Sequence, residues 1–202
     1  MMNAGPRSSQ AYDDLKRLIL SGSIPPGERL DPAGLAGELV YGITPLREAL
    51  LRLAGERLVD IRLNTGFYLP VMTETVLVDL YRLRFELLRV AVATSRNKSA
   101  LQTATLSPSF QADSPATVFL ELADSSGRPE LLAHLTTVND RLASVRAAES
   151  LLFGDTIQEL SSINTAMLAD DRTLLRVLRT YHSRRLSKAR ALVAALYAAP
   201  RE

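Results

Sequence analysis

The stretch from Gly42 to Leu53 constrains the fold more than any other part of the chain. Thr44 is a good N-cap residue, because its hydroxyl can accept a hydrogen bond from a free amide of a first helical turn. Pro45 then suits the first helical position, where a missing donor is no loss. The apolar residues that follow recur at three- and four-residue spacing, on one face of a helix. They are Leu46, Ala49, Leu50 and Leu53. The pattern predicts a helix that buries this face and presents Arg47 outward from its first turn.

Two further helices are predicted before this one. Ser9 to Leu20 carries apolar residues at helical spacing, and the glycines and prolines between Ser21 and Gly27 stop that helix. After a short strand from Glu28 to Leu30, Asp31 and Pro32 repeat the pattern of cap and proline. The apolar face of this second helix consists of Leu35, Ala36 and Leu39.

A β-hairpin is predicted after the third helix. Two short extended runs, Leu58 to Leu63 and Phe67 to Leu69, flank the turn Asn64-Thr65-Gly66. Helix, helix-turn-helix and hairpin together predict a winged helix-turn-helix domain over residues 7 to 70.

Several segments of this region resemble the N-terminal domain of GntR-family transcriptional regulators. They are Ile24 to Leu30, Thr44 to Leu50 and Asn64 to Phe67. The family docks the third helix in the major groove of DNA and the wing near the minor groove. The resemblance therefore implies that Arg47 reads a base, with guanine as the usual bidentate partner. It also implies that Thr44 binds a phosphate and that Gly66 lets the wing backbone approach DNA closely. The remaining DNA-binding candidates are Arg29, Arg52, Arg62, Asn64 and Thr65.

The chain departs from this family pattern at four positions. Gly42 and Ile43 stand where the family usually has a serine and an arginine. Leu51 stands where a basic residue is common, and Arg57 where glycine usually ends the helix. The missing cations imply weaker DNA binding or a different operator sequence.

The charged residues of the third helix leave one alternative open. Arg52 follows Glu48 at a spacing of four, so it either forms a surface ion pair or contacts a phosphate. The formal net charge of the chain is only +2, and acidic residues balance the basic ones in residues 1 to 70. Any DNA-binding surface must therefore arise from local placement of charge.

Composition argues against several other classes of protein. The chain has no cysteine, which excludes a disulfide framework and thiolate metal sites. Residues 1 to 10 contain no apolar core of a signal peptide, and no uncharged apolar run approaches the roughly 20 residues of a membrane span. We therefore expect a cytoplasmic protein without a membrane partner. With two histidines, no Ser/His/Asp spacing and no phosphate-binding glycine loop, we expect no enzyme.

Residues 73 to 199 predict an all-helical domain, so that the fold class is mainly α. Apolar residues at helical spacing mark five segments. They are Thr75 to Arg96, Ala116 to Ser125, Pro129 to Ala147, Thr156 to Ala169 and Arg172 to Ala198. The last helix is expected to cross the whole domain. Between the first two lies Asn97 to Pro115, for which a loop or a degraded helix is expected.

The order of these helices resembles the FCD effector domain of the FadR subfamily of GntR regulators. The residues that carry the resemblance are Leu80 to Arg84, Phe119, Ser126 to Leu132, Asp171 and His182. Many members hold a divalent metal with an acidic or amide residue and three histidines. The matching positions here are Ala116, Leu120, Leu160 and His182. One histidine cannot hold a metal, so the resemblance implies a domain without metal or other cofactor. His182 is then most simply a partly buried residue hydrogen-bonded to a neighbour.

Two roles remain open for this domain. A pocket lined by Leu120, Leu160, His182 and Arg84 would bind a small organic or fatty acid-like ligand, with Arg84 and His182 holding its carboxylate or phosphate. In the alternative, the pocket is filled and the domain serves only for oligomerisation or protein interaction. In either case we expect a homodimeric, sequence-specific regulator, a repressor or a dual regulator, that reads a short inverted repeat in double-stranded DNA.

Overall fold

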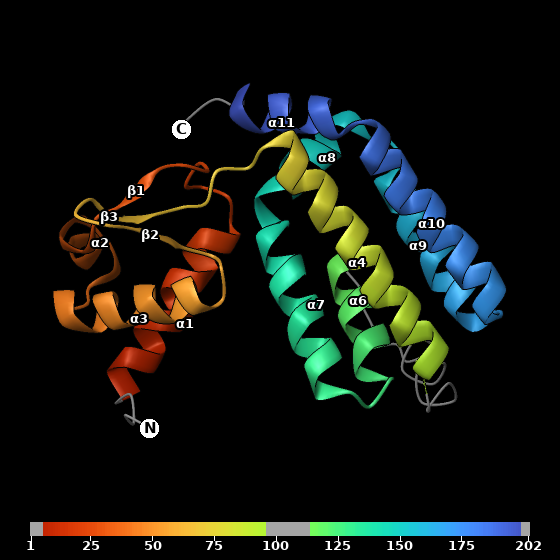
Figure 1. The fold of residues 1–202 in the computed structure, drawn as a ribbon, viewed down its shortest axis with the longest axis horizontal. Helices are drawn as coiled ribbons and strands as arrows, with labels where there is room; N and C mark the ends of the chain where they lie inside the picture. The colour runs from red at the N-terminus through yellow and green to blue at the C-terminus, as the bar shows by residue number, and fades with distance from the viewer. Residues whose placement is uncertain (1–5, 96–113, 199–202) are drawn as a thin grey trace.

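Three helices and a small sheet form the N-terminal part of the protein (Figure 1). A computed structural model describes residues 6–95 and 114–198. The helices are α1 (Pro6–Leu20), α2 (Pro32–Leu39) and α3 (Ile43–Gly55). The strands are β1 (Arg29–Leu30), β2 (Asp60–Arg62) and β3 (Gly66–Tyr68), paired antiparallel in the order β1-β3-β2. This part, residues 6–69, is called the head below, and it confirms the predicted winged helix-turn-helix.

The head is held together by the apolar face predicted for α3. Leu46, Ala49, Leu50 and Leu53 are fully buried, and Ala11 and Leu15 of α1 belong to the same core. Complete burial of each leucine contributes about 1.5 to 3 kcal/mol. The packing of α1 against α3 therefore fixes which face of α3 remains outside.

The start of α3 differs from the sequence prediction. Gly42, not Thr44, is the N-cap residue, and the helix begins at Ile43. The carbonyl of Gly42 accepts from the amide of Leu46 at 3.4 Å, which closes the first turn. Pro45 stays within this first turn, where amides lack helical partners, so a proline there does not fix the first residue. The hydroxyl of Thr44 is consequently left exposed.

The wing has the predicted hairpin form. Asn64 lies in the turn with φ 62°, and Gly66 begins β3 with φ 105°. Asparagine and glycine adopt positive φ more readily than other residues, which explains their place in this turn. The Cα register pairs Arg62 with Gly66 and Asp60 with Tyr68. Phe67, next to the turn, is buried in the head core and so holds the hairpin against the head.

The C-terminal part, residues 74–198, is helical in its described residues and is called the helical domain below. Its helices are α4 (Glu74–Thr94), α6 (Pro115–Asp124), α7 (Pro129–Arg141), the 3-10 turn η1 (Ala143–Val145), α8 (Arg146–Leu152), α9 (Thr156–Leu168), α10 (Asp171–Ser187) and α11 (Ala189–Ala198). Helices α4, α6 and α7 pack together, and α10 packs against α4 and α9, while α11 lies across one end (Figure 1). Of the segment for which we expected a loop or a degraded helix, residues 97–113 lie outside the described residues.

Two segments predicted as single helices are each broken. The segment Pro129 to Ala147 ends its first helix at Arg141 and continues as η1 and α8. The last segment is interrupted at Lys188, whose amide donates to the carbonyl of Arg185 at 3.1 Å, so α10 alone does not cross the domain. Nothing in the local sequence marks this break, because the apolar spacing continues through it.

The break at Lys188 separates two apolar cores of the helical domain. Helix α10 contributes Leu174, Leu178 and Tyr181 to the core shared with α4, α6 and α9. Helix α11 contributes Ala189 and Leu192 to a second core with the start of α4, the end of α7 and α8. The turn therefore lets each helix bury its own apolar face. Among the described residues, no helix is both long and apolar enough to cross a membrane.

Candidate functional site

The outer face of α3 presents Arg47 as the sequence predicted. Thr44, Arg47 and Leu51 follow one another at spacings of three and four, opposite the buried leucines. All three are exposed, with Leu51 at 54%. Arg47 has no ion pair or side-chain hydrogen bond within the described residues. Its guanidinium is thus free to meet a ligand at this face.

The other arginine candidates of the head are also uncompensated by carboxylates. Neither Arg29 nor Arg62 nor Arg52 forms an ion pair within 4.0 Å in the part of the chain that the structure describes. The Arg52 guanidinium lies 3.9 Å from the centre of the Tyr12 ring, and that of Arg62 lies 4.0 Å from the centre of the Tyr68 ring. Stacking on an aromatic face positions an arginine without neutralising its charge. These cations remain available for phosphate groups.

The ion pair considered for Arg52 is not formed. Glu48 instead accepts a hydrogen bond from the Ser8 hydroxyl at 2.6 Å, while Arg52 turns to the Tyr12 ring. The cation–π contact with α1 replaces the local pairing at i+4, because the tight packing of α1 on α3 brings Tyr12 alongside. Of the two alternatives, the surface ion pair was therefore wrong.

The departures from the family pattern lie at exposed or strained places. Ile43 is 50% exposed at the first position of α3, so an apolar side chain stands beside Thr44. Arg57, just after α3, has a left-handed backbone with φ 59°. Glycine adopts this conformation at no steric cost, which gives a physical reason for glycine in relatives with this turn. Val40, between α2 and α3, is likewise left-handed with φ 58° and 89% exposed.

In the helical domain, the structure brings Arg84 and His182 into direct contact. The Nε of Arg84 donates to His182 Nε2 at 3.1 Å. The other ring nitrogen, Nδ1, lies 2.7 Å from the carbonyl oxygen of Leu178. Because Nε2 accepts, Nδ1 must carry the proton and donate to Leu178, which fixes a neutral imidazole. Burial, and then the charge of Arg84, hold the pKa of His182 well below its usual value.

Aromatic rings that the sequence did not reveal surround this pair. The Arg84 guanidinium lies 5.2, 5.0 and 5.6 Å from the ring centres of Tyr81, Phe119 and Tyr181. Arg84 is only 4% exposed, and its Nη2 has no hydrogen-bond partner in the described residues. A buried donor without a partner is unfavourable by about 1 to 3 kcal/mol. The site thus combines an apolar surrounding with one unsatisfied cationic donor.

The two leucines assigned to this pocket are partly buried. Leu120 and Leu160 pack against the same core that contains Phe119 and Tyr181. In the described residues, no three acidic or histidine side chains gather as a metal-binding group. The lone pair of His182 Nε2 is moreover taken by the Arg84 proton.

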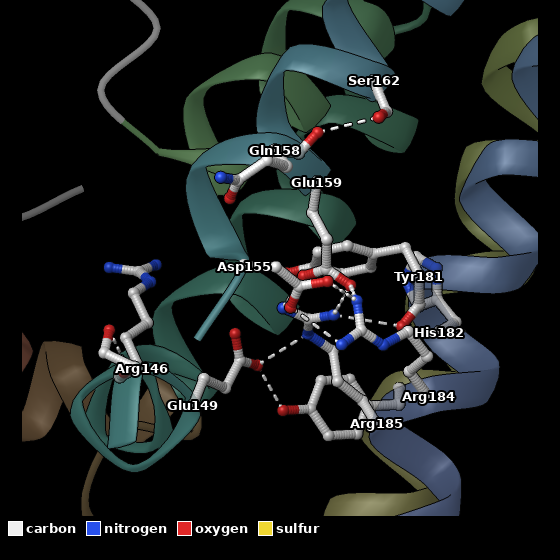
Figure 2. Close-up of polar contacts among 12 residues, drawn as sticks. Arg146, Glu149, Asp155, Gln158, Glu159, Ser162, Tyr181, His182, Arg184 and Arg185 are labelled. Atoms are coloured by element: carbon white, nitrogen blue, oxygen red, sulfur yellow. Dashed lines mark hydrogen bonds and ion pairs between the residues drawn. The ribbon is translucent and has the colours of Figure 1, made fainter. Parts of the chain in front are cut away.

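A buried cluster of charges lies next to this pair and was not foreseen. Figure 2 shows Arg185 of α10 directed toward Glu149 of α8 and Glu159 of α9. Its Nη2 lies 2.9 Å from Glu159 and its Nε 3.2 Å from Glu149, which also accepts from Tyr81. Arg185 is 1% exposed. Although burial opposes its charge, Tyr181 and the two carboxylates raise the pKa of Arg185. The cluster joins α8, α9 and α10, and the Nε of Arg185 has an ion pair but no hydrogen bond within the described residues.

Comparison with known proteins shows what the head is similar to. Residues 7–69 match the family model "Bacterial regulatory proteins, gntR family". The HTH-type transcriptional regulator McbR of Escherichia coli (strain K12) is 38% identical over 84 residues, 42% of this chain and 38% of that protein. The Nta operon transcriptional regulator of Aminobacter aminovorans is 32% identical over 135 residues, 60% of this chain and 64% of that protein. The matches thus span between 38% and 64% of these relatives.

Solved structures extend the likeness to the fold of the helical domain. E. coli McbR/YncC has a TM-score of 0.71 at 22% identity, covering 95% of this chain and 99% of that one. A putative GntR regulator from Rhodococcus sp. RHA1 has a TM-score of 0.69 at 20% identity, covering 96% and 99%. Residues 7–69 thus form a winged helix-turn-helix domain that matches the gntR family model, joined to a helical domain whose fold is similar to that of these solved structures.

Proposed function

We propose that this protein is a DNA-binding transcriptional regulator. The observation that carries the proposal is the exposed face of α3, on which Arg47 has no protein partner, within a head that matches the gntR family. The names of the relatives McbR and the Nta operon regulator, both transcriptional regulators, support it. An enzyme has no comparable support.

In the proposed complex, α3 enters the major groove and the wing lies near the minor groove. Arg47 reads a guanine through two hydrogen bonds, while Thr44 and Arg52 contact phosphates. Arg52 is already positioned by its stacking on Tyr12. The wing contributes Arg29, Arg62, Asn64, Thr65 and Gly66.

The domain over residues 73–199 is proposed to be of the FCD type of the FadR subfamily and to form a homodimer. Leu83, Leu87 and Val90 follow one another at helical spacing along α4, and Leu83 and Val90 are 48% and 42% exposed. A partly exposed apolar stripe of this kind suits helix packing between two copies. Two heads then read the halves of an inverted repeat in double-stranded DNA, and the regulator acts in the cytoplasm as a repressor.

The pocket of Arg84, His182, Leu120 and Leu160 is proposed to sense a small organic or fatty acid-like anion without metal. The unpartnered Nη2 of Arg84 supports this, because a carboxylate there would satisfy a buried donor. A ligand that binds the dimer better at one spacing of the two heads would raise the population of dimers with that spacing.

A second candidate role for the helical domain is dimerisation without an effector. It is favoured by the aromatic contacts of Arg84, since the rings of Tyr81, Phe119 and Tyr181 already fill space around its guanidinium. A thermal-shift screen with fatty, aromatic and other organic acids distinguishes the two roles. An acid that stabilises the wild type and Arg179→Met, a change at an exposed arginine of α10, but not Arg84→Met, supports a sensor.

The proposed function is tested by selection of binding sites from random double-stranded DNA by the full chain. We expect enrichment of a short inverted repeat that contains a guanine in each half. Equal recovery of all sequences at moderate salt, with no motif after repeated rounds, would refute sequence-specific binding. Native mass spectrometry of the complex should show two protein chains on one duplex.

A further inference from the structure

A small cavity lies where the head meets the helical domain, and its lining includes neither Arg84 nor His182. Its volume is about 40 Å³. Leu58 and Leu69 of the head, Val71 and Met72 of the connecting segment, and Val76 of α4 supply apolar walls. Because Val71 is 47% exposed, the cavity has an edge at the surface. A single water molecule needs about 10 to 15 Å³ of such space, so the cavity is larger than one water site.

Two arginines from different parts of the chain line the same cavity. Arg57 follows α3 in the head, and Arg141 ends α7 in the helical domain. Within the described residues, neither side chain has a hydrogen bond or an ion pair. Burial and the neighbouring charge of Arg57 lower the pKa of Arg141, so the two cations repel each other. The cavity is thus lined by two guanidinium groups that form no ion pair in the described residues.

The carboxylates near the cavity pair with neither arginine. Asp140 also lines it, but its Oδ2 lies 2.9 Å from Lys16 Nζ, which also pairs with Glu56. Asp60 on β2 acts on Arg141 through its charge and is itself exposed, without an ion pair to it. A mobile anion is the remaining partner that both guanidiniums lack.

We propose that this cavity binds the carboxylate of a short-chain organic acid between Arg57 and Arg141. Guanidinium groups bind carboxylates through paired, charge-assisted hydrogen bonds. The apolar walls at Val71, Met72 and Val76 receive the aliphatic tail, which favours an organic acid over inorganic phosphate. One anion held by both arginines ties the head to the helical domain. The site does not depend on whether the head binds DNA.

Titration calorimetry of the full chain with sodium butyrate, at low ionic strength, tests this site. We expect saturable binding of butyrate, weaker binding of phosphate, and none of the neutral analogue butyramide. Arg57→Gly and Arg141→Met should each weaken butyrate binding about tenfold, as loss of one charge-assisted contact implies. Arg57→Gly also relieves a left-handed backbone, so a thermal melt at or above that of the wild type would show that it folds.

Matched controls separate this site from the rest of the molecule. Arg179→Met, which removes an exposed arginine of α10, should leave butyrate binding unchanged. The proposal is overturned if wild type shows no saturable binding, if both cavity variants bind like wild type, or if phosphate binds as well as butyrate. Loss of binding in Arg84→Met alone would also overturn it, because the acid would then occupy the other pocket.

Discussion

Lys16 bridges the head and the helical domain, and its replacement tests how rigidly they are joined. Its Nζ lies 2.8 Å from Glu56, just after α3, and 2.9 Å from Asp140 at the end of α7. The Tyr12 hydroxyl donates to the same Glu56. Although burial alone would oppose the charge, Glu56 and Asp140 raise the pKa of Lys16. A raised pKa keeps this contribution complete at neutral pH, and it is lost only in strong alkali.

Lys16→Met should keep the packing of the aliphatic stem and remove the charge. Asp140 Oδ2 is buried and has no hydrogen bond in the described residues, so without Lys16 it would also lose its ion pair. Glu56 would still accept the hydrogen bond from the Tyr12 hydroxyl. Its side chain is also 33% exposed, so water can partly replace the lost ion pair with Lys16. An uncompensated buried acceptor is unfavourable by about 1 to 3 kcal/mol, so we expect about 2 kcal/mol in total. For a chain of this length, the melting temperature should fall by about 4 to 8 °C.

Calorimetric melting of the full chain measures this effect. With the bridge removed, the head should also melt separately from the helical domain, because Lys16 joins the two. Arg17→Met is the matched control, since the Arg17 side chain is 77% exposed and, among the described residues, pairs only with Asp14 on its own helix. Its effect should stay below about 0.5 kcal/mol. A melting curve of Lys16→Met that superimposes on that of Arg17→Met would refute the bridge.

Three further changes follow from the strained and exposed positions described above. Ile43→Arg, at an exposed position of α3, should tighten DNA binding and steepen the dependence of log affinity on log salt by about 0.9, measured by fluorescence anisotropy; an unchanged slope would count against a phosphate there. Val40→Asn should raise the free energy of unfolding by about 1 kcal/mol, measured by denaturant melting, because asparagine tolerates left-handed backbone better than valine. Because the pKa of His182 is lowered in the fold, the unfolded chain binds a proton at this histidine at a higher pH than the folded chain does. Stability should therefore fall below about pH 6.5 by up to about 1.4 kcal/mol per pH unit. His182→Gln should remove this slope, while His134→Gln, at the exposed second histidine, should keep it; equal slopes in all three proteins would contradict the buried neutral imidazole.

Local patterns in the sequence predicted the parts of the fold that local physics decides. The buried face of α3, the wing turn at Asn64 and Gly66, and the cap at Asp31 depend on residues close in the chain. Asp31 Oδ2 accepts from the amide of Gly34 at 3.1 Å, as predicted. The first residue of α3 was missed because Pro45 is tolerated anywhere in the first turn, so it does not mark a single start.

Features that depend on distant residues could not be predicted in the same way. The break at Lys188 serves two separate cores and leaves no glycine or proline as a signal. Arg84 and His182, which are in contact, lie on different helices and are 98 residues apart in the chain. The two residues were chosen from a resemblance, but the rings around Arg84 and the cluster of Arg185 with Glu149 and Glu159 appear only in three dimensions.

The base preference of Arg47→Ala tests the central claim most directly. The wild type and this variant are each titrated with the selected operator and with operators carrying every base at the guanine position. Arg179→Ala serves as the control for loss of a surface cation. We predict that Arg47→Ala loses about 1 to 3 kcal/mol on the selected operator and no longer distinguishes the bases at that position. Unchanged affinity and unchanged preference for guanine would contradict the account.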